Sequence, residues 1–180
     1  MRSRTLGVVL SALGALGIAT AISASTAQTP ANNDEFKQHM DAGTSFYEQG
    51  KSDDAIREFK SAVAVQPNSS LAHLWLGRAL GRKAEKANSV QAAFMVGGVR
   101  KEFERAVGLD PRSLEARSDL LEFYLDAPSS FGGGIAKAQM QAEAIARLDP
   151  AEGRRARARI AEKQMQYDIA SHENRATPRR

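Results

Sequence analysis

Residues 36–67 read FKQHMDAGTSFYEQGKSDDAIREFKSAVAVQP, and the second half of this stretch sets a spacing that recurs twice further along the chain. The intervals are four, three and five residues in each copy: Ala55–Phe59–Ala62–Pro67, Val99–Phe103–Ala106–Pro111 and Ala138–Ala142–Ile145–Pro150. Intervals of four and three place side chains on one face of a helix, and the proline ends that helix. Recurrence of this kind predicts stacked helix pairs, each of which buries its apolar face on its neighbour.

A second pattern precedes each copy and predicts the partner helix of each pair. Its positions are His39–Ala42–Gly43–Phe46, His73–Leu76–Gly77–Leu80 and Arg117–Leu120–Leu121–Tyr124. The glycine lets two antiparallel helices approach closely, and an aromatic residue at the last position fills the space between them. Together the positions follow W-x2-L-G-x2-Y, A-x3-F and P, which resembles the tetratricopeptide repeat (TPR). The resemblance implies an all-α, right-handed superhelix of three TPR-like helix pairs, followed by a C-terminal capping helix.

The first copy has the length of the family repeat, whereas the later two are longer. The prolines of successive copies lie 44 and 39 residues apart, against 34 in the family. The additional residues of the second and third copies lie between the two helices of a pair, at 83–98 and 126–134. The third copy also departs in composition, because Leu121 occupies the glycine position and Ala142 the aromatic one. The expected domain covers 34–170, with repeats at about 36–69, 70–113 and 114–152 and a capping helix at 153–170.

Two local signals refine the first pair. Gly50 stands where a glycine is expected to end the first helix. Ser52 is expected to be the N-cap of the second helix, with Asp53 and Asp54 in the first turn, where the helix dipole favours acidic side chains.

The first 27 residues are typical of a secretory signal peptide. Arg2 and Arg4 precede an apolar run at 6–22, and small residues then lead to an expected cleavage site after Ala27. The alternative is an uncleaved membrane anchor, for which a run of 17 residues is short. After cleavage no stable membrane span is expected, residues 28–33 form a linker, and residues 171–180 form a disordered basic tail.

The composition and the N-terminus together predict an exported bacterial protein, periplasmic or secreted by the general secretory route. The chain has no cysteine, which excludes disulfides and leaves stability to the helical core. The twin-arginine signal is also absent. Charge is divided unevenly, since residues 28–153 have a net charge of −3 and residues 154–180 a net charge of +5. The arginines from Arg154 to Arg159 either form a solvated capping face or bind an anionic lipid or polymer, and no nucleic-acid partner is expected.

No catalytic constellation is recognisable, so we expect a protein that is not an enzyme and uses no cofactor. His39 and His73 occupy equivalent positions in successive repeats and either share a metal or replace the family's tryptophan in packing. No Cys or Glu at ligand spacing supports the metal, and none is expected. The glycines at 132–134 precede a helix, but without a following Gly-Lys-Ser/Thr they indicate a turn rather than a phosphate loop.

The resemblance also implies where a ligand would bind, because TPR arrays usually hold extended peptides along the concave face lined by the first helix of each repeat. The corresponding candidates are Met40, Thr44, Trp75, Arg78, Arg82, Glu115 and Asp119. Glu115 and Asp119 stand where relatives that clamp a carboxylate have cations, so basic or neutral apolar peptides are expected here. Trp75, the single tryptophan, is either a binding anchor or a core residue.

These observations predict a non-catalytic scaffold of the bacterial envelope that binds a protein or peptide of unknown identity in the concave groove. One alternative is an architectural subunit that associates with copies of itself into a homo-oligomer. The other is a protein that binds anionic lipid or polymer at the envelope surface through its basic C-terminal helix.

Overall fold

The structure, a computed structural model, describes residues 30–176 of the 180-residue chain. The expected signal peptide and the last four residues of the expected tail lie outside this range. Within it the chain forms seven α-helices and one short 3-10 turn, with no strand. They are α1 (Pro30–Glu48), α2 (Ser52–Val65), α3 (Ser70–Lys86), α4 (Ser89–Leu109), α5 (Leu114–Asp126), η1 (Ser129–Phe131), α6 (Ile135–Leu148) and α7 (Pro150–Ala176).

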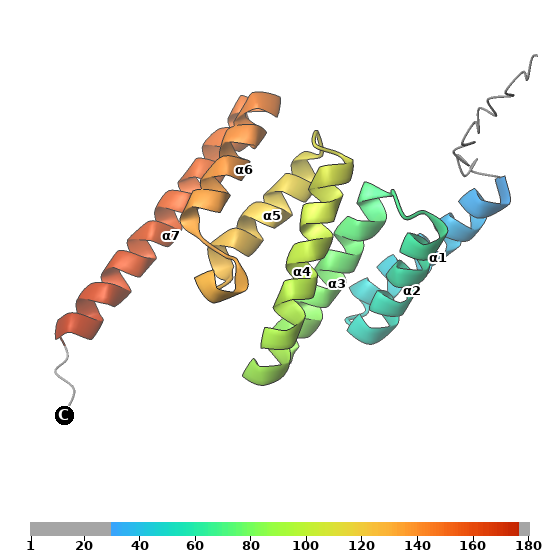
Figure 1. The fold of residues 1–180 in the computed structure, drawn as a ribbon, viewed down its shortest axis with the longest axis horizontal. Coiled ribbons are helices and arrows are strands. Elements are labelled where there is room, and N and C mark those ends of the chain that lie inside the picture. Colours follow the sequence, from blue (N-terminus) through green and yellow to red (C-terminus); the bar gives the residue numbers. More distant parts are fainter. Residues whose placement is uncertain (1–29, 177–180) are drawn as a thin grey trace, which may run out of the picture.

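The helices stack side by side in chain order as antiparallel pairs (Figure 1). The pairs are α1 with α2, α3 with α4, and α5 with α6, and α7 packs on α6 and more lightly on α5. The expected all-α superhelix of three helix pairs and a final helix is therefore confirmed. Two boundaries differ from expectation: α1 begins at Pro30, inside the expected linker, and α7 continues to Ala176, into the expected tail.

Close contact between a glycine and a phenylalanine joins the two helices of the first and second pairs. A Cβ atom added to Gly43 would lie 2.6 Å from the Phe59 ring, and one added to Gly77 would lie 2.7 Å from the Phe103 ring. The role expected of these glycines is thus confirmed. In the third pair the large and the small residue are exchanged: Leu121 occupies the glycine position and Ala142 the phenylalanine position. Both are buried in one cluster.

A polar contact also links the two helices of every pair at equivalent positions. His39 Nδ1 lies 2.9 Å from Glu58 Oε2, and His73 Nδ1 lies 2.5 Å from Glu102 Oε2. In the third pair Arg117 donates to Gln141 over 2.8 Å. Each histidine therefore belongs to the packing of its own pair. Among residues 30–176 no group of three or more His, Cys, Asp or Glu side chains is placed to hold a metal ion.

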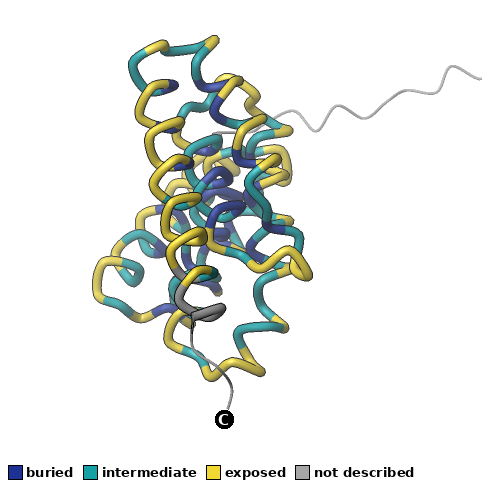
Figure 2. The backbone as a smooth tube through the Cα atoms, turned by 90° about the vertical axis from the view of Figure 1, so that its left-hand side faces the viewer, coloured by how far each residue is buried: buried dark blue, intermediate teal, exposed yellow. Residues whose placement is uncertain are grey.

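The buried side chains form two clusters that meet at α3. One lies between α1, α2 and α3, the other extends from α3 to α7, and Leu80 packs against both. Figure 2 shows buried positions gathered between the helices, while the outer side of α7 is exposed. Within the described range no helix is both long and apolar enough to cross a membrane.

Helix ends follow the local signals with one exception. Gly50 has a φ of +73°, as a glycine at a helix end allows. The hydroxyl of Ser69 accepts a hydrogen bond from the backbone N–H of Ala72 and caps α3. The hydroxyl of Ser113 caps α5 in the same way, through the N–H of Ala116. The expectation for Ser52 is wrong, because α2 already begins at this residue and its buried hydroxyl has no hydrogen-bond partner in the part of the chain that the structure describes.

Candidate functional site

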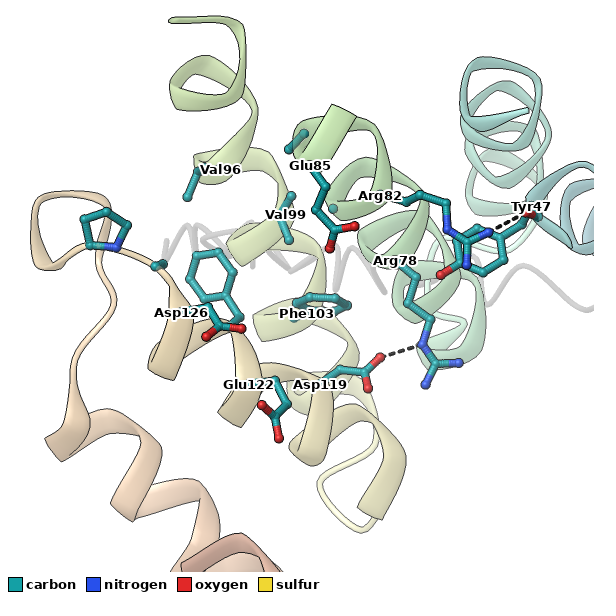
Figure 3. Close-up of a pocket in the computed structure, with 15 residues that line it drawn as sticks. Tyr47, Arg78, Arg82, Glu85, Val96, Val99, Phe103, Asp119, Glu122 and Asp126 are labelled. Carbon is teal, nitrogen blue, oxygen red and sulfur yellow. Dashed lines mark hydrogen bonds and ion pairs between the residues drawn. The ribbon is translucent and has the colours of Figure 1, made fainter. Parts of the chain in front are cut away.

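An open cavity of about 520 Å³ lies between α3 and α5, with α4 as its floor (Figure 3). We call this cavity the groove. Because α3 and α5 are the first helices of their pairs, it lies on the side of the array where the sequence predicted ligand binding. Tyr47 at the end of α1 closes it on the N-terminal side.

Both segments that lengthen the repeats form walls of the groove. The longer α3–α4 hairpin supplies Ala84, Glu85 and Val96. The insertion after α5 begins with Asp126 and supplies Ala127 and Pro128 as well. The residues that depart from the family spacing thus meet at one place, although the sequence alone offered no role for them.

The floor of the groove is apolar. Val99 and Phe103 of α4 are almost completely buried, and Val96 and Phe123 are half-buried beside them. Phe103 packs against Gly77 and also borders the groove, so the aromatic side chain that joins α3 to α4 is also part of the groove lining.

Arg78 neutralises the two acidic residues on which the ligand preference was based. Its guanidinium pairs with Glu115 over 2.8 Å and with Asp119 over 2.5 Å, and it also lies 4.9 Å from the centre of the Trp75 ring. Burial by itself lowers the pKa of Arg78, but its hydrogen bonds and charge interactions with Asp119 and Glu115 raise that pKa overall. The negative charges of Glu115 and Asp119 are therefore largely neutralised by Arg78 within the protein.

Arg82 ties α3 to α1. It donates a hydrogen bond to the backbone carbonyl of Tyr47, and its guanidinium lies 3.4 Å from the centre of the Tyr47 ring. Arg78 and Arg82, two of the groove candidates, are thus both engaged by partners, and neither guanidinium is available as a carboxylate clamp without breaking these contacts.

Four of the seven predicted site residues do not line the groove: Met40 and Thr44 of α1, Trp75 of α3 and Glu115 of α5. Met40 is only 7% exposed and belongs to the N-terminal core. Thr44 donates its hydroxyl proton to the carbonyl of Met40. Trp75 is half-buried, stacks on Phe59 with ring centres 5.8 Å apart, and meets the edge of Tyr47 at 5.4 Å. Trp75 thus packs among aromatic side chains and does not line the groove.

The groove also contains acidic residues that the sequence analysis missed. Glu122 accepts from Arg159 of α7 over 2.7 Å, and Asp126 accepts from Lys163 of α7 over 2.8 Å. The hydrogen bond to Asp126 raises the pKa of Lys163. Glu85 lies on the α3 side. Glu122 and Asp126 follow Asp119 at helical intervals on α5, which is the signal that could have found them.

Comparison with known proteins supports the resemblance for part of the chain. Residues 43–83 match a family model described as TPR repeat. They include the end of α1, all of α2 and most of α3. No curated protein matches.

Several solved structures share the fold at low sequence identity. The second TPR domain of human RPAP3, in complex with the HSP70 peptide SGPTIEEVD, is 17% identical with a TM-score of 0.57, and the match covers 72% of this chain and 98% of that one. The Arabidopsis OM64 TPR domain is 11% identical with a TM-score of 0.56, covering 73% and 98%. MamA is 19% identical with a TM-score of 0.50, covering 81% and 83%. The fold is therefore that of TPR domains, a class of helical repeat that generally binds proteins or peptides.

Proposed function

We propose that this chain is a non-catalytic scaffold that binds a protein or peptide segment in the groove. The observation that carries the proposal is the convergence of both insertions, through Glu85 and Val96 on one side and Asp126 and Pro128 on the other, on one apolar-floored cavity. Extra residues that served only to extend turns would have no reason to line the same space.

The shape and lining of the groove favour a polypeptide over a compact small molecule. Its volume lies within the range of about 300–1,000 Å³ typical of ligand sites, but the cavity is open along the array. An apolar floor with charged walls suits an extended segment that buries some side chains and leaves its backbone near water. The peptide seen with the RPAP3 domain gives a precedent for this use of the fold.

The setting is proposed from the sequence. The charged start, the apolar run at 6–22 and the small residues before Ala27 support export to the bacterial envelope, where the partner would be found. A second candidate, binding of an anionic lipid or polymer, is favoured by the exposed Arg154 and Arg157 on α7. Self-association remains the third, and the oligomeric state of the purified chain tests it.

The test is a peptide-array screen of the chain beginning at Gln28, followed by titration calorimetry with the best peptides. Val96→Asp places a charge beside the apolar floor of the groove and should weaken binding at least about tenfold, or about 1.4 kcal/mol. Val90→Asp is the matched control, because Val90 is on the same helix, is 67% exposed and does not line the groove.

Unchanged affinity of a folded Val96→Asp variant would contradict binding in the groove. Binding to anionic vesicles that is lost on replacing Arg154 and Arg157, with no peptide binding, would favour the second candidate instead. Mass spectrometry of the exported protein should give Gln28 as the first residue, and an intact Met1 on a membrane-bound form would contradict cleavage.

A further inference from the structure

The carboxylates around the groove differ in their partners. Asp119 is held by Arg78, which is itself half-buried and fixed over Trp75. Glu122 and Asp126 are instead paired with cations of α7, outside the groove. The side chain of Glu85 makes no ion pair or hydrogen bond among the described residues. Of the carboxylates on the walls, that of Glu85 is therefore unpaired among the described residues. Those of Glu122 and Asp126 are paired only with α7, on the side away from the groove.

The pairs with α7 are exchangeable. The side chains of Arg159 and Glu122 are 58% and 38% exposed, and those of Lys163 and Asp126 are 27% and 69% exposed, so solvent reaches both contacts and partly screens them. Exposed ion pairs are worth only about 0–1 kcal/mol each, since solvation competes with them and long side chains lose entropy on pairing. A cation arriving from the groove can thus replace Arg159 or Lys163 at small cost.

These carboxylates, which could bind a cationic group of a ligand, lie beside the apolar floor of the groove. Figure 3 shows Glu85 on the α3 side of the groove, and Glu122 and Asp126 on the α5 side, with Phe103 of the floor between the two walls. A side chain that enters the floor places its neighbours along the chain near one wall or the other. Anionic groups would meet carboxylates there, because Arg78 and Arg82 are already engaged.

We infer that the groove binds a segment in which an apolar side chain is adjacent to a lysine or arginine, and that Arg159 and Lys163 of α7 compete with that cation for Glu122 and Asp126. This inference rests on the proposed function, because it names the ligand class of the same groove. The competition makes the capping helix a regulator of affinity: any change that draws α7 cations away from α5 exposes the two carboxylates to the ligand.

The experiment uses three synthetic peptides that share an apolar centre, Leu-Phe-Leu, and differ only in flanking residues: Lys, Gln or Glu. Calorimetry with the chain from Gln28 should rank Lys above Gln above Glu, and added salt should reduce the difference. Glu122→Gln with Asp126→Asn should remove most of the preference for the Lys peptide and leave the Gln peptide nearly unaffected.

The competition is tested by Arg159→Gln with Lys163→Gln, which should strengthen binding of the Lys peptide by about threefold or more. The matched control is Arg154→Gln with Arg157→Gln, which removes the same net charge from α7 at exposed positions that do not line the groove. Equal strengthening by both pairs of substitutions would overturn the competition, since only the overall charge would then matter.

Two further outcomes separate this inference from the proposed function. If all three peptides bind with equal affinity and Val96→Asp abolishes binding, groove binding stands and the inferred ligand class is wrong. If no peptide binds in a manner sensitive to Val96→Asp, the proposed function itself fails. Best binding of the Glu peptide, unchanged by the Glu122 and Asp126 substitutions, would also overturn the inference.

Discussion

The first helix pair and the second use the same contact to join their helices but end with different surfaces. In the first pair Phe59 packs against Gly43 and is fully buried, because Trp75 covers it by stacking. In the second pair Phe103 packs against Gly77 in the same way, yet it borders the open groove. The repeated contact builds the array, and the site arises where the next layer does not cover that contact.

The covering layer of the first pair is a ladder of aromatic rings and arginines. Tyr47 and Trp75 meet edge to face, Arg82 lies over the ring of Tyr47, and Arg78 lies over the ring of Trp75. Among the described residues no equivalent rings cover Phe103, because Gly81 and Asp119 occupy the positions equivalent to Tyr47 and Trp75. The lengthened hairpin and the insertion after α5 form walls beside Phe103 and leave the groove open.

The largest predicted effect tests this difference in burial. Phe59→Ala should cost about 3–5 kcal/mol of unfolding free energy, since it removes a fully enclosed ring between two helices. Phe103→Ala should lower the unfolding free energy by an amount at the low end of that range, because part of the ring already faces an open cavity. Urea unfolding of both variants provides the measurement. A larger loss for Phe103→Ala would mean that the second pair is the better packed of the two.

The second prediction concerns the exchange of sizes in the third pair. Leu121→Gly alone should cost about 2–5 kcal/mol, because it leaves a cavity opposite Ala142. Ala142→Phe alone should overpack the same interface and cost about 1–3 kcal/mol. Combined, the two substitutions recreate the glycine–phenylalanine arrangement of the other pairs and should recover part of both losses.

A double-mutant cycle measures this recovery directly, since residues in contact show coupling that distant residues lack. Additive losses would mean that Leu121 and Ala142 do not occupy the positions equivalent to Gly77 and Phe103. Recovery would show that the helix pairs share one packing arrangement, in which the large side chain can come from either the first or the second helix.

The helix pairs were predictable from the sequence because their signals are local. The glycine and phenylalanine positions recur at helical intervals, and buried faces of this kind leave a regular pattern. The groove was predictable only in part. Asp119 occupies a position of the family pattern, and Arg78 and Arg82 lie near such a position, whereas Glu85 and Val96 lie in a segment with no counterpart in that pattern. The pairing of Arg78 with Asp119 joins residues 41 positions apart and carries no sequence signal of its own.

The smallest predicted effect compares Phe46 and Tyr124, which occupy the same position in the first and third pairs. Tyr124 donates its phenolic proton to Glu104 of α4 over 3.0 Å, and its ring is buried. Burial first, and then the hydrogen bond to Glu104, raise the pKa of Tyr124 from 10.0 to about 12. Phe46 has no group that titrates, so only the third pair should respond to alkaline pH through this position.

The direction of the response follows from proton binding. Between pH 10 and about 12 the unfolded chain loses the phenolic proton while the folded protein keeps it, so the unfolding free energy falls as the pH rises. The contribution is complete below pH 10 and is lost as the pH passes through the folded-state value. Urea unfolding at about pH 9 and about pH 11.5 should show a steeper decline for the wild type than for Tyr124→Phe. All other side chains are the same in the two proteins, so the difference between the two profiles isolates Tyr124. Parallel profiles would mean that the bond to Glu104 does not hold the proton and that α4 and α5 are joined by apolar packing alone.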